Sequence, residues 1–325
     1  MRGAAALWRR QESALAAVLA AALIVMSLVS RDFLTARNLV SMPLYFVEPG
    51  LIVLAMTLVI VTGGIDLSVG STMALAAVAL GIVWGKWHLP IAAAVLAALV
   101  VGALAGAVNG LIVTRLGVPP LMVTLATMAG FRGLAVGLSH AEPVSDFPPS
   151  FLALGNTLIP FGRGANVPAQ LFCFVLVALV AGVLLSRTVL GRYLYAIGHN
   201  ETAARYAGIQ VDGLKLGVYT GAGLVAALAG VIAVARFSTA KADAGTGMEL
   251  QVITACVLGG VDIYGGRGTI LGAVLGLLTI SVVDNGLQMA GVGSEARTVA
   301  VGLILIAAVV LGQLGRRGQP RAGEE

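Results

Sequence analysis

The sequence predicts an all-α integral membrane protein, a polytopic bundle of about ten transmembrane helices, some broken or short, with both termini in the cytoplasm. Hydrophobic residues make up 58% of the 325 residues and charged residues only 11%, whereas a soluble domain carries about 25% charge. The apolar residues form continuous runs of helix length, not the alternating pattern of a membrane β-barrel. The 43 glycines suit packed transmembrane helices, because small residues let two backbones approach closely.

Each expected span approaches the roughly 20 residues that a bilayer requires. The ten spans lie near residues 14–30, 44–62, 66–84, 90–113, 121–139, 168–186, 214–235, 247–261, 269–288 and 297–314. Glycine and aspartate interrupt the ends of 66–84 and 247–261, which favours broken or partly re-entrant helices that other segments cover. We expect residues 1–325 to form one transmembrane domain.

The distribution of Lys and Arg supports a cytoplasmic N-terminus. With that orientation, twelve basic residues fall in cytoplasmic segments and seven in outer ones, as the positive-inside rule requires. The apolar run from Ala14 to Val29 could instead belong to a secretory signal, but no Ala-x-Ala-like cleavage site precedes Arg31. An uncleaved first span is therefore favoured, and the protein is expected to cross its membrane many times.

Several kinds of chemistry are missing from the sequence. None of the three lysines is followed by Ser or Thr, so there is no phosphate-binding loop for ATP hydrolysis. There is no Gly-x-Ser-x-Gly nucleophile motif and no histidine pair at metal spacing. Cys173 and Cys256 lie in apolar runs and predict neither a disulfide nor a metal site. The net charge of +5 is explained by the basic loops and needs no nucleic acid partner. We therefore expect no catalytic residues, no metal and no cofactor in this chain.

Ionisable groups within the expected spans are few. For Asp66 and Asp262 a turn or cap is favoured over ion binding, because Gly-Gly precedes each. Asp284 is the best candidate for a polar group facing a pathway. Glu48, before Pro49-Gly50, could line a kinked helix, and Arg132 is expected to pair or to reach the interface.

Glycines four residues apart predict close helix contacts on three expected spans. These sets are Gly102/Gly106/Gly110, Gly217/Gly221 and Gly268/Gly272/Gly276. A weaker pattern is the echo of Gly63-Gly64-Ile65-Asp66 in Gly259-Gly260-Val261-Asp262, which could be an internal repeat or coincidence. The Pro- and Gly-rich break at 140–168 is either a binding region or a plain connector.

The polar segment 187–213 is expected to lie in the cytoplasm and contains a short helix. Asn200 is a favourable N-cap, Glu201 and Arg205 are spaced for an ion pair, and Gly208 is a natural stop. About seven helical residues are too few to be stable alone in water. The helix must be held by its own bundle or by a partner, and these features alone favour neither.

Residues 198–209, Gly-His-Asn-Glu-Thr-Ala-Ala-Arg-Tyr-Ala-Gly-Ile, resemble the coupling loop of bacterial ABC-transporter permeases of the ribose and monosaccharide type, in the branched-chain-amino-acid/ribose-like permease family. Residues 62–71, Thr-Gly-Gly-Ile-Asp-Leu-Ser-Val-Gly-Ser, look like that family's most specific signature. Weaker matches occur at 244–250, 257–260 and 265–269, and the resemblance covers about 45–315.

The resemblance implies partners. A separate ATP-binding-cassette ATPase would bind ATP and Mg²⁺ and dock on 187–213. A periplasmic or lipid-anchored sugar-binding protein would deliver substrate, and a second permease copy or a paralogue would complete the pathway. His199 and Tyr206 depart from the family's usual residues on the docking surface. The implied ATPase-coupling residues are Gly198, His199, Asn200, Glu201, Ala203, Ala204, Arg205 and Gly208.

The sequence therefore predicts the transmembrane permease subunit of an importer of a ribose-, xylose- or rhamnose-like sugar. An alternative within the family is the autoinducer-2 signal, and a different class is a secondary transporter or channel that works alone. A path for a neutral sugar is expected to carry polar groups and few charges. The signature and pathway candidates are Gly63, Gly64, Asp66, Ser68, Gly70, Ser71, Asn109, Asp284, Asn285 and Gln288.

Overall fold

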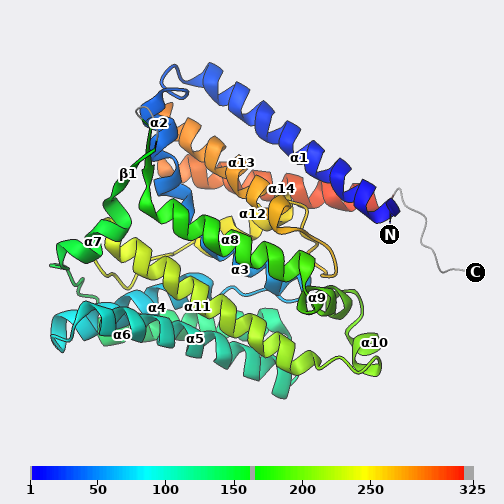
Figure 1. Ribbon diagram of the computed structural model, residues 1–325, viewed down its shortest axis with the longest axis horizontal. Helices are drawn as coiled ribbons and strands as arrows, with labels where there is room; N and C mark the ends of the chain where they lie inside the picture. The colour runs from blue at the N-terminus through cyan, green and yellow to red at the C-terminus, as the bar shows by residue number, and fades with distance from the viewer. Residues whose placement is uncertain (1, 162–164, 318–325) are drawn as a thin grey trace, which may run out of the picture.

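The computed structural model describes residues 2–161 and 165–317, whose regular secondary structure is almost entirely helical (Figure 1). A single antiparallel hairpin, β1 (Leu158–Phe161) with β2 (Ala165–Pro168), is the only sheet in this part of the chain. The helices are α1 (Arg2–Val29), α2 (Ala36–Ser41), α3 (Pro43–Val61), α4 (Val69–Gly81), the π-helix η1 (Ile82–Lys86), α5 (Ile91–Arg115), α6 (Pro120–Ser139), α7 (Pro149–Asn156), α8 (Ala169–Arg187), α9 (Val189–His199), α10 (Glu201–Tyr206), α11 (Val211–Phe237), α12 (Met248–Leu258), α13 (Ile270–Met289) and α14 (Ser294–Arg317).

Eight of the described helical segments are long and apolar enough to cross a membrane. They coincide with eight of the ten spans that the sequence predicts. The expected span 247–261 contains only the 11 residues of α12, about 16 Å of helix, roughly half of a 30 Å hydrocarbon core. The tenth expected span lies within α14. The all-α membrane fold is thus confirmed, while the count of about ten crossings and the cytoplasmic termini stay predictions.

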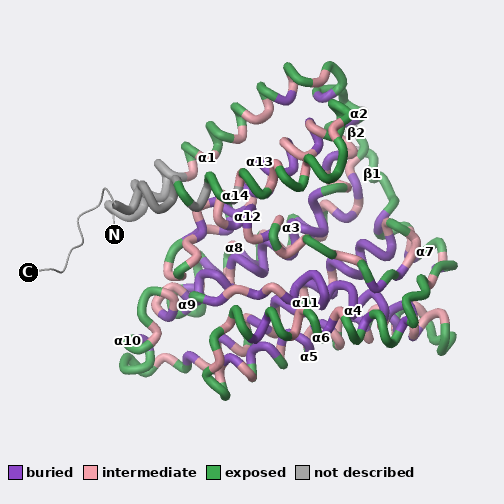
Figure 2. Tube along the Cα trace, turned by 180° about the vertical axis from the view of Figure 1, so that it is seen from behind, coloured by how far each residue is buried: buried purple, intermediate pink, exposed green. Residues whose placement is uncertain are grey.

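Helix α3 forms the centre of the bundle. In the segment Ala36–Val61, 83% of the most apolar window is buried, and α3 packs against α8, α11, α12 and α13. Helix α11 is also central, because it contacts α3, α4 and α5. Figure 2 shows this buried interior between exposed outer helices, with α1 on the outside along α13. Most of the sites described in the next subsection lie at the ends of these two central helices.

Two of the three predicted glycine contacts are present. The backbones of α5 and α11 meet at Gly102 and Gly106, where an added Cβ would lie within 2.5 Å of Gly223 and Tyr219 carbonyl oxygens. Gly272 and Gly276 of α13 approach α12 in the same way. The prediction for Gly217 and Gly221 is wrong within this chain, because a Cβ there would meet nothing within 4 Å. The spacing of four places these two residues on one face, but none of the described helices covers that face.

Replacing Gly106 by alanine is expected to destabilise the bundle. The new Cβ would lie 2.1 Å from the Tyr219 carbonyl oxygen, so α5 and α11 must move apart, a cost of about 1–3 kcal/mol. Gly217→Ala is the matched control on open surface and is expected to leave stability unchanged or slightly raised. Thermal unfolding of the two detergent-solubilised variants measures the difference, and equal midpoints would contradict the close contact.

The segment 140–168 is more ordered than a plain connector. It contains α7 and the β1–β2 hairpin, and Val144 pairs with Ala240 through two backbone hydrogen bonds of 3.1 and 2.8 Å. Phe147 stacks on Trp84, whose Nε1 donates to the Asp146 carbonyl oxygen at 3.1 Å. These contacts attach the segment to η1 and to the residues that follow α11.

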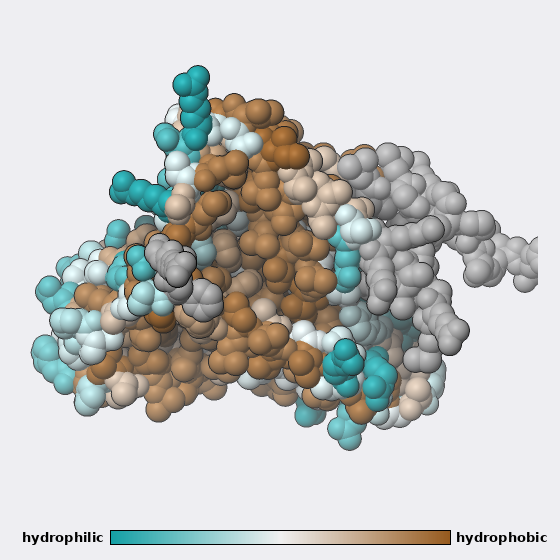
Figure 3. Space-filling model, turned by 45° about the horizontal axis from the view of Figure 1, so that its top comes forward, coloured by the Kyte–Doolittle hydropathy of each residue, from teal (hydrophilic) through white to brown (hydrophobic). Residues whose placement is uncertain are grey.

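The surface carries the broad apolar area expected of a protein surrounded by lipid. Figure 3 shows hydrophobic residues over much of one face, with hydrophilic residues gathered towards its ends. On α5 and α8, leucines such as Leu96, Leu104 and Leu176 are 60% exposed or more. Contiguous apolar surfaces of this extent are rare on soluble monomers, so these helices fit a lipid environment.

Candidate functional site

The segment 187–213 folds into two short helices with well-defined ends. The Thr188 hydroxyl accepts from the Gly191 N–H at 3.3 Å at the start of α9. The Asn200 carboxamide oxygen accepts from the Ala203 N–H at 2.9 Å and caps α10. Gly208 adopts φ +81°, the left-handed conformation that ends helices. The cap and the stop therefore lie where the sequence predicts them.

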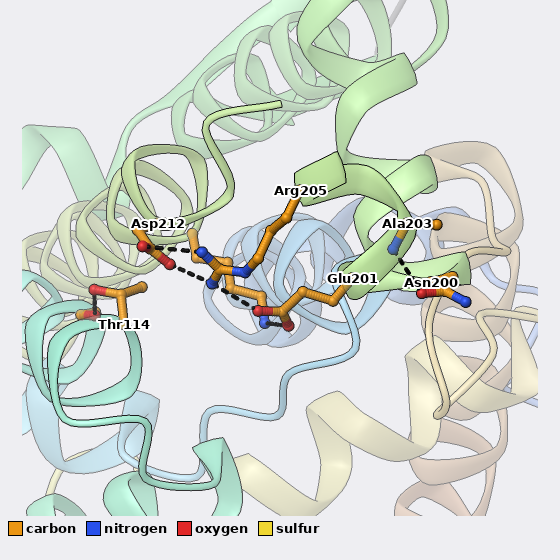
Figure 4. Close-up of polar contacts among 8 residues, drawn as sticks. Thr114, Asn200, Glu201, Ala203, Arg205 and Asp212 are labelled. Carbon is orange, nitrogen blue, oxygen red and sulfur yellow. Dashed lines mark hydrogen bonds and ion pairs between the residues drawn. The ribbon is translucent and has the colours of Figure 1, made fainter. Parts of the chain in front are cut away.

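Four charged side chains tie α10 to the beginning of α11 (Figure 4). The Arg205 guanidinium donates to both carboxylate oxygens of Asp212, at 3.1 and 2.5 Å, and to Glu201 at 2.9 Å. The ammonium of Lys215, which is only 10% exposed, bonds the other oxygen of Glu201. We call Glu201, Arg205, Asp212 and Lys215 the ion-pair cluster. It alternates in sign and holds a helix that is too short to persist alone.

The outer face of α10 is free of the bundle. Ala204 is buried with Ile197 and Val211, whereas Ala203 and Tyr206 point outwards and Tyr206 is 89% exposed. The predicted coupling residues therefore divide by position. His199, Asn200, Ala203 and Gly208 are exposed, Ala204 faces inwards, Gly198 is half-buried, and Glu201 and Arg205 bond α11.

The attachment of α10 is expected to depend on pH through Glu201. Partial burial raises the pKa of this carboxyl, but hydrogen bonds and positive charge from Lys215 and Arg205 outweigh burial and hold the pKa below 4.5. A depressed folded-state pKa stabilises the folded form above the unfolded value, and this contribution is lost as pH falls through the folded pKa. Hydrogen exchange of α10, corrected for intrinsic rates, should show constant protection from pH 8 to 6 and weaker protection below about 4.5. Glu201→Gln should flatten that dependence; an unchanged profile would contradict the assignment.

A contact of glycines joins α9 to two loops, and we call it the glycine junction (Val61, Gly63, Gly198, Gly265, Gly266). A Cβ on Gly198 would lie 1.9 Å from the Val61 carbonyl oxygen and 2.4 Å from the Gly266 nitrogen. The Gly266 N–H donates to that carbonyl at 2.9 Å. Gly63, Gly265 and Gly266 all have positive φ. The end of α3 and the loop after α12 therefore meet directly beneath the end of α9.

The echo in the sequence marks two similar turns. Gly63 follows α3 and Gly260 follows α12, both with φ +80°. Asp66 accepts from the Ser68 N–H at 2.9 Å, and Asp262 accepts from the Tyr264 N–H at 3.0 Å. Both aspartates thus form side-chain turns, as the sequence predicts.

The signature residues form a buried hydrogen-bonded network. The Ser68 hydroxyl donates to Asp66 at 2.6 Å, and the Asn109 amide donates to that hydroxyl at 2.7 Å. The Ser71 hydroxyl donates to the Ser68 carbonyl oxygen at 2.8 Å. Gly64 and Gly70 permit close approach of Tyr219 and of Gly245, respectively. This network fastens the loop between α3 and α4 to α5, and its four polar side chains are at most 2% exposed.

The remaining pathway candidates lie in a second cluster. Arg297 donates to Asp284 at 3.1 Å and to Gln288 at 3.4 Å. Asn285 exchanges two hydrogen bonds with Asn38, at 2.8 and 3.1 Å. Asp284, the favoured pathway group, is thus ion-paired. These contacts join α13 to α14 and to α2, and the structure does not bring them together with the signature network.

A cavity of about 460 Å³ lies near the start of α3 and the end of α11. None of the ten signature and pathway candidates lines it. Glu48, which the sequence analysis placed at a kink, lines it and is paired at 3.2 Å with Arg236. Sequence reasoning missed Arg236, because a basic residue at the end of an apolar helix is usually an interfacial anchor. Among the described residues no three His, Cys, Asp or Glu side chains gather as a metal site.

Comparison with known families identifies the class of this bundle. A family profile described as branched-chain amino acid transport system / permease component matches residues 38–311. The chain belongs to this family. The match includes α3 to α13 and therefore the glycine junction, the ion-pair cluster and the cavity. The chain is thus a multi-pass membrane protein of the permease class.

Individual relatives align with this permease over nearly its whole length. The ribose import permease protein RbsC of Escherichia coli K12 is 40% identical over 306 residues, 94% of both chains. The autoinducer 2 import system permease protein LsrD of Photorhabdus laumondii is 37% identical over 305 residues, 92% of this chain and 90% of that protein. A comparison with solved structures found no match.

Proposed function

We propose that this permease is the transmembrane subunit of an ATP-binding-cassette importer that moves a ribose-, xylose- or rhamnose-like monosaccharide across the bacterial cytoplasmic membrane. The whole-length similarity to a ribose import permease carries the proposal. The many apolar helices and the few charged groups are consistent with a path for a neutral solute. ATP and Mg²⁺ would be bound by a separate ATPase subunit.

In this proposal α10 is the contact for the ATPase. Its exposed face, with Ala203 and Tyr206, is available to a partner, and the ion-pair cluster fixes its other face to α11. A force applied to α10 would reach α11 through the cluster and α3 through the glycine junction. The permease must switch between a state open to the outside and a state open to the cytoplasm. ATP can drive this switch only if the ATPase binds the two states differently. Because α10 is attached to α11, its position would differ between the two states, and the ATPase could distinguish them.

Two further partners belong to the proposal. A second copy of the permease, or a paralogue, would pack beside this chain, and a periplasmic or lipid-anchored binding protein would deliver the sugar. In the proposed orientation, residues 187–213 and both termini lie in the cytoplasm. The cavity near Glu48 then opens towards the outer side of the membrane.

The alternative substrate is the signal molecule imported by the autoinducer-2 system. The two kinds of relative differ by only 40% against 37% identity over similar lengths, so overall similarity favours neither substrate clearly. The substrate must be decided by transport.

The test is uptake by proteoliposomes that contain the permease with its candidate ATPase and binding protein. We expect accumulation of radiolabelled D-ribose or of autoinducer-2 only with internal ATP and Mg²⁺, and no effect of dissipating proton and sodium gradients. Uptake driven by an ion gradient with the permease alone would contradict the proposal. Accumulation of autoinducer-2 without D-ribose would retain the importer and replace the substrate.

A further inference from the structure

We propose that the cavity beside Glu48 and Arg236 is a substrate subsite of the permease itself, which binds a neutral, polyhydroxylated small molecule. This inference rests on the proposed function and names the residues that would hold the transported molecule.

The cavity has the size and composition of a small-molecule site. Its volume of about 460 Å³ lies within the roughly 300–1,000 Å³ of typical ligand pockets. Residues from α3, α4, α11, α12 and the connection between α11 and α12 line it. Helices from both halves of the sequence therefore converge on one space, which polar and apolar side chains line together.

One buried oxygen in the lining lacks a partner. Glu48 is only 3% exposed, and its Oε2 is bonded to Arg236 at 3.2 Å. Its Oε1 has no hydrogen-bond partner among the described residues. A buried unsatisfied oxygen costs about 1–3 kcal/mol, so a bound donor at this position would remove a real penalty. This orphaned acceptor is independent of the cavity's shape and points to a ligand with a donor group.

The charges of the lining favour a neutral ligand. Glu48 and Asp243 are balanced by Arg236 and Lys241, so an ionic ligand gains no net attraction from them. A hydroxyl group both donates and accepts, and it can therefore satisfy Glu48 Oε1 while it accepts from a neighbouring cation. Several hydroxyls on one small molecule would use the two acids and two bases at once.

Aromatic rings hold the key cation in place. The Arg236 guanidinium carbon lies 4.2 Å from the centre of the Phe237 ring and 5.8 Å from that of Tyr45. Such contacts orient a guanidinium group. Tyr45 and Phe237 also line the cavity and supply the apolar surface that small-molecule pockets use beside a few polar groups.

Arg132 positions the rim of the cavity from outside. Its guanidinium donates to the carbonyl oxygens of Ala242 and Ala244, at 2.6 and 2.9 Å. The sequence analysis expected Arg132 to pair or to reach the interface, and the structure shows it holding the backbone between Lys241 and Gly245 instead. That backbone carries Lys241 and Asp243 into the lining.

The subsite lies at the opposite end of α3 from α10. Glu48 is thirteen residues before Val61, a separation of about 20 Å along a helix, and Val61 touches Gly198 in the glycine junction. Helix α11 likewise carries Lys215 of the ion-pair cluster near one end and Arg236 at the other. A molecule in the cavity would therefore contact α11, which α10 contacts directly, and α3, which α9 contacts in the glycine junction.

The decisive experiment measures binding of radiolabelled D-ribose to the permease–ATPase complex in nanodiscs, without the binding protein. The altered complex carries Glu48→Gln with Arg236→Gln, which removes both charges and leaves neither unpaired. Glu142→Gln, on an exposed residue outside the lining, is the control. Thermal unfolding and retained ATPase association confirm that each variant is folded, and Arg236→Lys tests whether charge alone restores binding.

We expect saturable, millimolar binding by the unaltered complex and by Glu142→Gln, at least a tenfold weaker affinity for the double variant, and partial recovery for Arg236→Lys. Absence of saturable binding by the unaltered complex, or equal affinity of the double variant, overturns the subsite. If the unaltered complex binds ribose saturably but shows no ATP-driven import in proteoliposomes with the binding protein, the proposed function is overturned and the subsite still stands.

Discussion

Replacing Arg205 by glutamate is expected to reduce ATP-driven uptake at least tenfold. The change places a third acid beside Glu201 and Asp212 and removes the guanidinium that bonds both of them. Of the side-chain contacts between α10 and α11, the Glu201–Lys215 pair and the buried Ala204 contact then remain. Six helical residues cannot persist without tertiary contacts, so the outer face presented by Ala203 and Tyr206 loses its fixed position. Uptake in proteoliposomes with ATPase and binding protein measures the effect.

Two further variants separate this explanation from a general effect of charge. Arg37→Glu makes the same change on exposed α2, far from α10 in Figure 1, and should transport normally. Arg205→Glu combined with Asp212→Arg exchanges the two signs and should recover part of the uptake. If the double exchange gives no recovery, or if Arg205→Glu transports like the unaltered protein, the ion-pair cluster does not hold α10 for coupling.

Replacing Gly198 by alanine is the second change with a large expected effect. The new methyl group would meet the Val61 carbonyl oxygen at 1.9 Å and the Gly266 nitrogen at 2.4 Å. Both are backbone atoms and cannot rotate away, so α9 must move from the glycine junction at a cost of about 1–3 kcal/mol or more. We expect a lower unfolding temperature and at least a tenfold loss of uptake.

Gly213→Ala is the matched control for this prediction, because a Cβ at Gly213 meets nothing within 4 Å. It adds the same methyl group to the neighbouring helix α11. Equal unfolding temperatures and equal uptake for the two alanine variants would show that the junction tolerates displacement, and the proposed route from α10 to α3 would fail.

The sequence predicts the features that depend on local rules. The helix cap at Asn200, the stop at Gly208 and the pair Glu201–Arg205 follow from spacing alone, because each involves residues within one turn of helix. The eight membrane-capable helices follow from apolar length. The aspartate turns after Gly63-Gly64 and Gly259-Gly260 follow from the preference of glycine for positive φ.

Features that join distant segments could not be predicted in this way. Nothing in the sequence indicates that Glu201 bonds Lys215, that Arg236 pairs with Glu48 across 188 residues, or that Gly198 lies beneath Val61. The spacing of Gly217 and Gly221 predicted a close contact that this chain does not make, because periodicity identifies a face and not its neighbour. Asp284 was favoured as a free pathway group, but Arg297 neutralises it.

The most direct measurement of the central claim is the affinity of the ATPase for the Tyr206→Ala variant. Tyr206 is 89% exposed, so its removal takes little from the fold and isolates docking from stability. Exposed tyrosines are common binding hot spots, worth about 2 kcal/mol or more when they are central to an interface. The permease is held in nanodiscs, and the control is Trp87→Ala, on a 64% exposed aromatic residue directly after η1. We predict at least tenfold weaker ATPase binding for Tyr206→Ala and unchanged binding for Trp87→Ala. Unchanged affinity would contradict the assignment of α10 as the coupling helix.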